Sequence, residues 1–155
     1  MQINKGINAL IRINPLLFIL FFLIISYLAS YITLLFPASA SQNDTVQLLE
    51  NQWQKIFIGV LVVPFVETLV FQTLIISIIC NIIKRPKYSL YTSILISAMA
   101  FALNHSYNIY YILNTFLAGI ILAFAYYISR YRKMSATLTI FIIHSIWNSI
   151  SFLTE

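Results

Sequence analysis

Five long apolar stretches, separated by short polar or basic segments, dominate the chain. They cover residues 15–36, 53–83, 88–103, 109–128 and 136–153. A helix that crosses the hydrocarbon core of a bilayer needs about 20 mostly apolar residues. The pattern therefore predicts an all-α integral membrane protein, a bundle of about five transmembrane helices.

The first apolar stretch follows Lys5 and Arg12 and is followed by Ala38-Ser39-Ala40, which are features of a secretory signal peptide. Its length exceeds the roughly 7 to 15 apolar residues of a signal core, so we expect a retained span. On this basis residues 1–52 form a membrane anchor helix with an extracellular loop. Residues 53–155 form a four-helix membrane core.

Five spans place nearly all the basic residues on one side of the membrane. Of the nine lysines and arginines only Lys55 falls on the other side, where Asp44, Glu50 and Glu155 also fall. Because basic residues are enriched on the cytoplasmic side, we expect a cytoplasmic amino terminus and an external carboxyl terminus. The short chain, in which we see no organelle-targeting signal, favours a multi-pass protein of a bacterial plasma membrane.

Composition supports the membrane class. Hydrophobic residues make up 61% of the chain and charged residues only 8%, against about 25% charged in a soluble domain. The net charge of +5 follows from the topology, so we expect the lipid bilayer and not nucleic acid as a partner. The single cysteine, Cys80, lies in an apolar run and is interpreted as a packing residue. Nothing in the sequence indicates the oligomeric state.

Three titratable side chains interrupt the apolar stretches. Glu67 lies near the middle of the second stretch, His105 ends the third, and His144 lies in the fifth, one turn before Asn148. An ionisable group at such a depth costs at least about 2.5 kcal/mol on the insertion scale, so its presence needs a reason. We expect the three side chains to converge, although single histidines and a protonated carboxyl group can also simply hydrogen-bond neighbouring helices.

If they converge, these side chains include the groups that are needed to hydrolyse an amide bond. A carboxylate near an imidazole can activate water, and a second imidazole with an amide can stabilise an oxyanion. Glu67, His105 and His144 could alternatively bind zinc with one open position, although no cofactor is expected. A proton relay in a small transporter is a third possibility, which the lack of a visible inverted repeat disfavours.

Pro64 lies one turn before Glu67 in the second stretch. In an α-helix it would leave the carbonyl of Val60, four residues earlier, without its backbone donor. We expect a kink at this point.

The same residues stand in segments that resemble the CPBP family of intramembrane endopeptidases, which includes CAAX prenyl proteases and bacteriocin-processing (Abi) proteins. That family carries EExxxR, FxxxH and HxxxN motifs on successive helices. The matching segments here are PFVETLVFQ at 64–72, FALNH at 101–105 and HSIWN at 144–148, with a glycine-bearing helix, NTFLAGIILAFAYY, at 114–127. The resemblance covers roughly residues 55–152.

The resemblance implies a role for each matching residue. Glu67 would be the water-activating base, His105 would assist it, and His144 with Asn148 would stabilise the oxyanion. Phe101, four residues before His105, is expected to pack beneath it. The implied activity is hydrolysis of a peptide bond in a membrane-associated peptide, protein or lipidated substrate.

The chain departs from the family motif at Thr68, where the family has its second glutamate, and at Gln72, where it has arginine. These positions are four apart on a helix, so the family pattern would form an ion pair there. We expect Thr68 and Gln72 to form a neutral hydrogen bond in its place. The departures also leave open a catalytically silent relative that binds other membrane proteins, in bacteriocin self-immunity or cell-envelope regulation.

Overall fold

The computed structural model describes residues 5–33, 51–105 and 108–154, and their regular structure is helical throughout. The helices are α1 (Lys5–Arg12), α2 (Pro15–Thr33), α6 (Pro86–Asn104), α7 (Ile109–Ser129) and α8 (Ala136–Thr154). Between α2 and α6, one long helix is built from α3 (Gln52–Phe57), α4 (Val63–Glu67) and α5 (Ile76–Ile82), joined by the π-helical segments η1 (Ile58–Val62) and η2 (Thr68–Ile75). The all-α class predicted from the sequence is confirmed.

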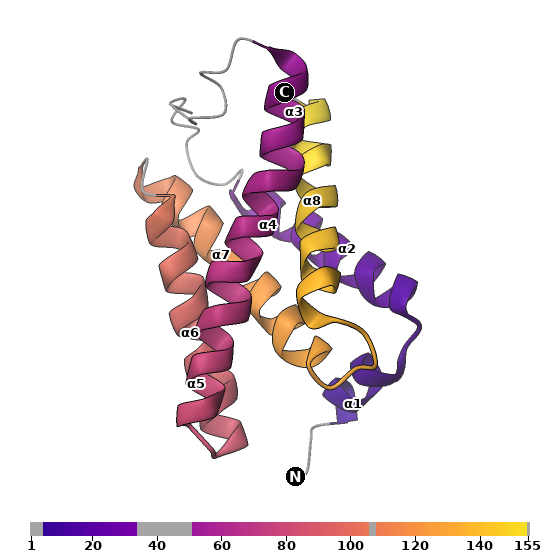
Figure 1. Ribbon diagram of the computed structural model, residues 1–155, viewed down its shortest axis with the longest axis vertical. Coiled ribbons are helices and arrows are strands. Elements are labelled where there is room, and N and C mark those ends of the chain that lie inside the picture. The colour runs from indigo at the N-terminus through magenta and orange to yellow at the C-terminus, as the bar shows by residue number, and fades with distance from the viewer. Residues whose placement is uncertain (1–4, 34–50, 106–107, 155) are drawn as a thin grey trace.

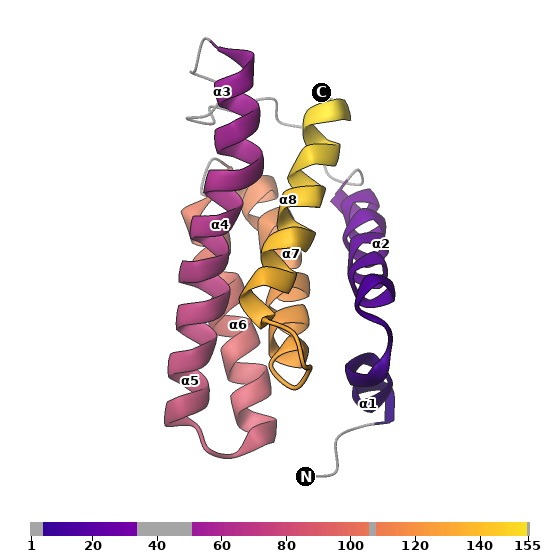
Figure 2. The same ribbon diagram turned by 45° about the vertical axis from the view of Figure 1, so that its right-hand side comes forward.

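The long helices run up and down beside one another, and α7 lies among α2, α6 and α8 (Figures 1 and 2). Phe18 and Phe22 of α2 are buried in the same apolar cluster as Leu122 and Tyr126 of α7. The anchor helix therefore shares its core with the remaining helices. The predicted division of the chain after residue 52 stays a prediction.

Three described helices are long and apolar enough to cross a membrane: Gln52–Ile82, Ile109–Ser129 and Ala136–Leu153. The apolar part of α2, Pro15–Tyr31, is shorter. That α6 also spans stays a prediction, which rests on its 19 residues and its place in the bundle.

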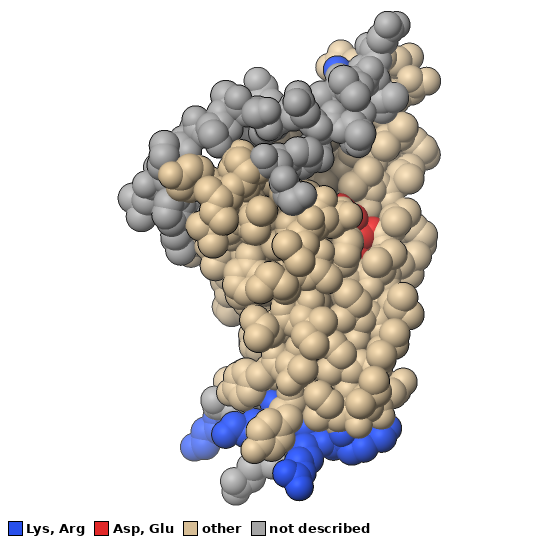
Figure 3. All heavy atoms as spheres, turned by 90° about the vertical axis from the view of Figure 1, so that its left-hand side faces the viewer, with Lys and Arg blue, Asp and Glu red and all other residues tan. Residues whose placement is uncertain are grey.

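Lysine and arginine side chains gather at one end of the molecule, as Figure 3 shows. This is the end at which α1 lies and at which α5 leads into α6 and α7 into α8 (Figure 2). The distribution agrees with the charge pattern from which a cytoplasmic amino terminus is predicted.

Close packing between α6 and α7 depends on small residues. Ser93, Ser97, Ala98 and Ala102 form part of the buried face of α6, and Gly119 of α7 lies directly against Ala98. A Cβ atom at Gly119 would come within 2.9 Å of the Ala98 Cα. Small residues let helix backbones approach this closely in membranes, where van der Waals contact drives association.

The first helix, α1, was not predicted from the sequence. It places Ile7, Leu10 and Ile11 against the core, while Lys5 and Arg12 are exposed. With only 8 residues it adds no apolar stretch of spanning length. Its signal in the sequence is amphipathic, because Ile7, Leu10 and Ile11 recur at the helical spacing i, i+3 and i+4.

Arg132, in the turn between α7 and α8, fastens the end of α1. Its guanidinium group donates hydrogen bonds to the carbonyls of Leu10, Ile11 and Ile13, at 3.1 Å for Ile11 and 2.8 Å for Ile13. It also lies over the ring of Phe18, 4.3 Å from the centroid. These bonds satisfy carbonyls at a helix end, which have no partner within the helix.

The π-helical register adds a second consequence to the one expected for Pro64. The N–H of Val63 bonds the carbonyl of Ile58, five residues earlier, so the carbonyl of Gly59 loses Val63 as its donor. In this register its next donor would be residue 64, and proline has no N–H. The carbonyl of Gly59 is therefore also left without a backbone donor. Asn148 of α8 supplies the missing bond, with its Nδ2 2.9 Å from the Gly59 oxygen.

Gly119→Ala is expected to destabilise the bundle by about 1 to 3 kcal/mol, because the added methyl group overpacks the α6–α7 interface. The new Cβ would also approach Phe101 Cδ1 to 3.2 Å. Thermal unfolding in detergent micelles measures the effect. Gly6→Ala is the matched control, since nothing lies within 4 Å of a Cβ there. Equal melting temperatures for the two variants would contradict the interface described here.

Asn148→Ala is expected to cost about 1 to 3 kcal/mol, because it leaves the buried Gly59 carbonyl without a donor. In a Pro64→Ala background the same substitution should cost less, since residue 64 then offers its own N–H to that carbonyl. A double-mutant cycle of melting temperatures measures this coupling. Strictly additive effects would show that Asn148 does not replace the donor missing at Pro64.

Candidate active site

Glu67, His105 and His144 converge from three different helices. The Nε2 atom of His105 lies 3.2 Å from Oε1 of Glu67, and Nε2 of His144 lies 3.6 Å from Oε2. The side chains are largely buried, with exposed fractions of 10% for Glu67, 15% for His105 and 6% for His144. One carboxyl group is thus held between two imidazoles inside the bundle.

His105 ends α6, and the helix end fixes the position of its ring. Its backbone N–H bonds the carbonyl of Ala102 at 3.0 Å, and its Nδ1 lies 2.8 Å from the carbonyl oxygen of Phe101. A carbonyl oxygen only accepts, so Nδ1 carries a hydrogen. The Nε2 atom is thereby directed toward Glu67.

This tautomer decides which groups can stand between Nε2 of His105 and the carboxyl group of Glu67. With Nδ1 protonated, a neutral imidazole would present the lone pair of Nε2 to the oxygen of Glu67. The 3.2 Å contact with an ionised carboxylate would then be repulsive. A proton on either the imidazole or the carboxyl group makes this contact attractive, and a cation bound between the two atoms would do the same.

Aromatic rings form one wall of the site. Phe101 lies beneath both imidazoles, with ring centroids 4.6 Å from His105 and 5.8 Å from His144. The ring of Phe71 in η2 lies 5.6 Å from that of Phe101. The wall makes this side of the carboxyl group apolar, which strengthens the electrostatic contacts within the site.

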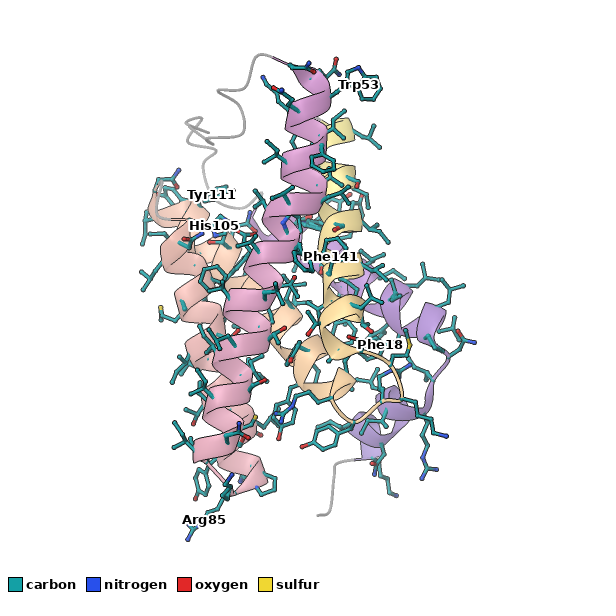
Figure 4. The ribbon with its side chains drawn as sticks, viewed as in Figure 1. Phe18, Trp53, Arg85, His105, Tyr111 and Phe141 are labelled. Atoms are coloured by element: carbon teal, nitrogen blue, oxygen red, sulfur yellow. The ribbon has the colours of Figure 1, made fainter. Side chains whose placement is uncertain are left out.

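Tyr111 is a site residue that the sequence reasoning missed. Its ring centroid lies 6.1 Å from that of His105 (Figure 4). The side chain of Asn108 accepts the N–H of Tyr111 at 2.8 Å and so caps the start of α7. The sequence contained one signal for this contact. The connection after His105 is short, so the next helix, α7, has to begin beside the end of α6.

A ring contact positions α8 beside the carboxyl-bearing helix. Phe141 of α8, labelled in Figure 4, meets Phe65 of α4 edge to face, with ring centroids 5.5 Å apart. Phe141 precedes His144 by one turn, and Phe65 precedes Glu67 by two residues. The contact therefore sets the height of His144 relative to Glu67.

The amide of Asn148 is directed to the backbone of η1. The hydrogen bond shown for its side chain goes to Gly59, as described above, and not to Glu67 or His144. An amide nitrogen carries two hydrogens, and this bond uses one. The expected role of Asn148 as an oxyanion donor stays a prediction.

The predicted hydrogen bond between Thr68 and Gln72 is wrong. Both residues are fully buried in η2, and Thr68 Oγ1, Gln72 Oε1 and Gln72 Nε2 have no hydrogen-bond partner within the described part of the protein. The prediction assumed an α-helix, whereas the π-helical register makes five residues, not four, the hydrogen-bonded repeat. The short threonine side chain does not reach Gln72 in that register.

The donor set for zinc is also less favourable than the sequence suggested. Within the described ranges, no group of three His, Cys, Asp or Glu side chains is arranged to hold a metal ion. The two Nε2 atoms face different oxygens of the Glu67 carboxyl group. A shared metal would need them to turn toward one point.

The family comparison agrees with the resemblance seen in the motifs. A family model described as type II CAAX prenyl endopeptidase Rce1-like matches residues 49–150. No curated protein and no solved structure matches the chain. The matched region contains Glu67, His105, His144 and Asn148 and covers most of the chain. The protein therefore belongs to the Rce1-like family of type II CAAX prenyl endopeptidases, which is a family of proteases.

Proposed function

We propose that the protein is an intramembrane endopeptidase of the glutamate type, which hydrolyses a peptide bond in a membrane-associated or lipidated substrate. The observation that supports this most is the carboxyl group of Glu67 held between two imidazoles in a membrane helix. An ionisable residue at such a position is expensive and commonly functional. No cofactor enters the proposal.

In the proposed reaction, a water oxygen attacks the carbonyl carbon of the scissile bond while Glu67 takes one of its protons. The proton that makes the Glu67–His105 contact attractive resides on His105 at this stage, so that Glu67 is an ionised base. His144, with the second amide hydrogen of Asn148, stabilises the oxyanion. The C–N bond then breaks, and the proton on Glu67 passes to the leaving nitrogen. One water is consumed for each new carboxyl and amino terminus.

The surroundings of the site favour a substrate that lies in the membrane. Apolar side chains such as Phe65, Val66 and Leu69 are exposed on the helix that carries Glu67. Figure 3 shows a small acidic area on one lateral face, remote from the basic end, and Glu67 is the only acidic residue among the described ones. We propose sideways access in a plasma membrane of bacterial type.

The second candidate function is a catalytically silent membrane interaction protein. The three polar atoms of Thr68 and Gln72 without hydrogen-bond partners favour it, because the bracing expected next to Glu67 is missing. Under this alternative the protein would bind other membrane proteins, for example in bacteriocin self-immunity, without cutting them.

Glu67→Gln is expected to reduce cleavage of a membrane-peptide library by about 10²- to 10⁴-fold, because an amide cannot take a proton from water. Purified variants at equal folded yield, analysed by mass spectrometry of the products, provide the measurement. Glu50→Gln makes the same change in the polar segment before the second span and should leave cleavage unchanged.

Parallel reactions with a chelator separate the glutamate mechanism from a zinc mechanism. Cleavage that survives the chelator but not Glu67→Gln supports the proposal, whereas cleavage lost to the chelator and restored by zinc would replace it with metal catalysis. If the wild type cuts nothing while it captures a membrane partner equally well with Gln at position 67, the interaction protein is the better description.

Gln72→Arg alone is expected to destabilise the fold by about 3 to 5 kcal/mol, because it buries an unpaired charge at a fully buried position. The double substitution Thr68→Glu with Gln72→Arg supplies the partner and should recover most of that loss. Melting temperatures in detergent measure both variants. Equal melting temperatures for the single and double variants would contradict pairing between these positions.

A further inference from the structure

A cavity of about 390 Å³ opens at the basic end of the molecule, away from Glu67. It lies between the α1–α2 connection and the α7–α8 turn. Three of its lining residues are cationic and several are apolar or aromatic, including Arg12, Arg132, Lys133, Tyr131, Ile13 and Met134. Its volume falls within the range of small-molecule sites, well above the space that one water needs.

Arg132 gives this cavity a fixed positive wall. Its two terminal nitrogens bond backbone carbonyls, as described for the fold, and these neutral acceptors leave its charge uncompensated. Its Nε atom is buried and has no hydrogen-bond partner in the described structure. Arg12 and Lys133 are exposed on the cavity rim.

No described carboxylate neutralises these charges. The only described acidic residue is Glu67, whose ion-pair contacts are with His105 and His144. Figure 3 shows the basic end without acidic atoms near it on the face that it presents. A cavity with three unneutralised cations attracts an anion.

We propose that this cavity binds the phosphate headgroup of an anionic membrane lipid. The combination of cations with apolar lining residues fits a molecule that is anionic at one end and apolar at the other. The cavity also lies at the end of the spans, the level at which lipid headgroups meet a membrane protein. A free phosphate would use the cations but not the apolar part of the lining.

Lipid binding to the purified full-length protein tests the proposal. Native mass spectrometry titrates phosphatidylglycerol and, separately, phosphatidylcholine against wild type, Arg12→Gln/Lys133→Gln and Lys84→Gln/Lys87→Gln. The last variant removes the same charge from the α5–α6 turn and the start of α6, at the same end of the molecule and outside the cavity. Arg132 stays unchanged because it fastens α1.

Each basic side chain near an anionic headgroup is worth about fivefold in affinity. The cavity variant should therefore bind phosphatidylglycerol about 25-fold more weakly, while the control variant binds it within about twofold of wild type. Phosphatidylcholine should bind more weakly than phosphatidylglycerol to wild type. Equal losses in the two variants would overturn the site in favour of unspecific surface attraction.

Competition with inorganic phosphate separates the lipid from a free anion. If phosphate displaces phosphatidylglycerol only at concentrations far above that of the lipid, the result supports a lipid site. The apolar lining then contributes to the affinity for the lipid. Displacement at equal concentration would overturn the lipid site and identify a phosphate site.

Discussion

A carboxyl group inside a membrane helix has to find its partners within the protein, because the hydrocarbon offers none. Glu67 finds them in His105 and His144, at 3.2 and 3.6 Å, and these come from two other helices. The helices α4, α6 and α8 are thereby fixed relative to one another at one level of the bundle. His105 is held in turn by the carbonyl of Phe101, so the partner of the carboxyl group is itself positioned by the end of α6.

The irregularity of the second long helix serves the same arrangement. The π-helical segments η1 and η2 lie on either side of the short α-helical turn that ends at Glu67. The register of η1, together with Pro64, releases the carbonyl of Gly59, and Asn148 takes it. Asn148 lies one turn after His144 on α8. The bond that completes the backbone of one helix therefore holds in place the imidazole that faces the carboxyl group.

The long helices and the partners of Glu67 could be predicted from the sequence, because hydropathy and the cost of desolvating a charge determine them. The apolar runs gave the long helices to within a few residues where these are described, and the cost of Glu67 required partners, which identified His105 and His144. Hydropathy does not distinguish an α- from a π-helical register, so the bond of Asn148 to Gly59 and the separation of Thr68 from Gln72 could not be predicted. The short α1 does carry a helical pattern, with Ile7, Leu10 and Ile11 at i, i+3 and i+4, but it lies outside the apolar stretches of spanning length. The contact of Tyr111 depends on a chain connection, which carries no periodic signal.

Thr68 and Gln72, the two positions at which the chain departs from the motif that it resembles, are best considered together. An unpaired charge in the bundle costs more than an unsatisfied neutral amide or hydroxyl group. With neither charge present, Thr68 and Gln72 are merely without partners, whereas one charged residue alone at these positions would be buried unpaired. A neutral pair and an ion pair also contribute the same net charge beside Glu67. The contacts that hold Glu67, with His105 and His144, therefore do not depend on an ion pair at positions 68 and 72.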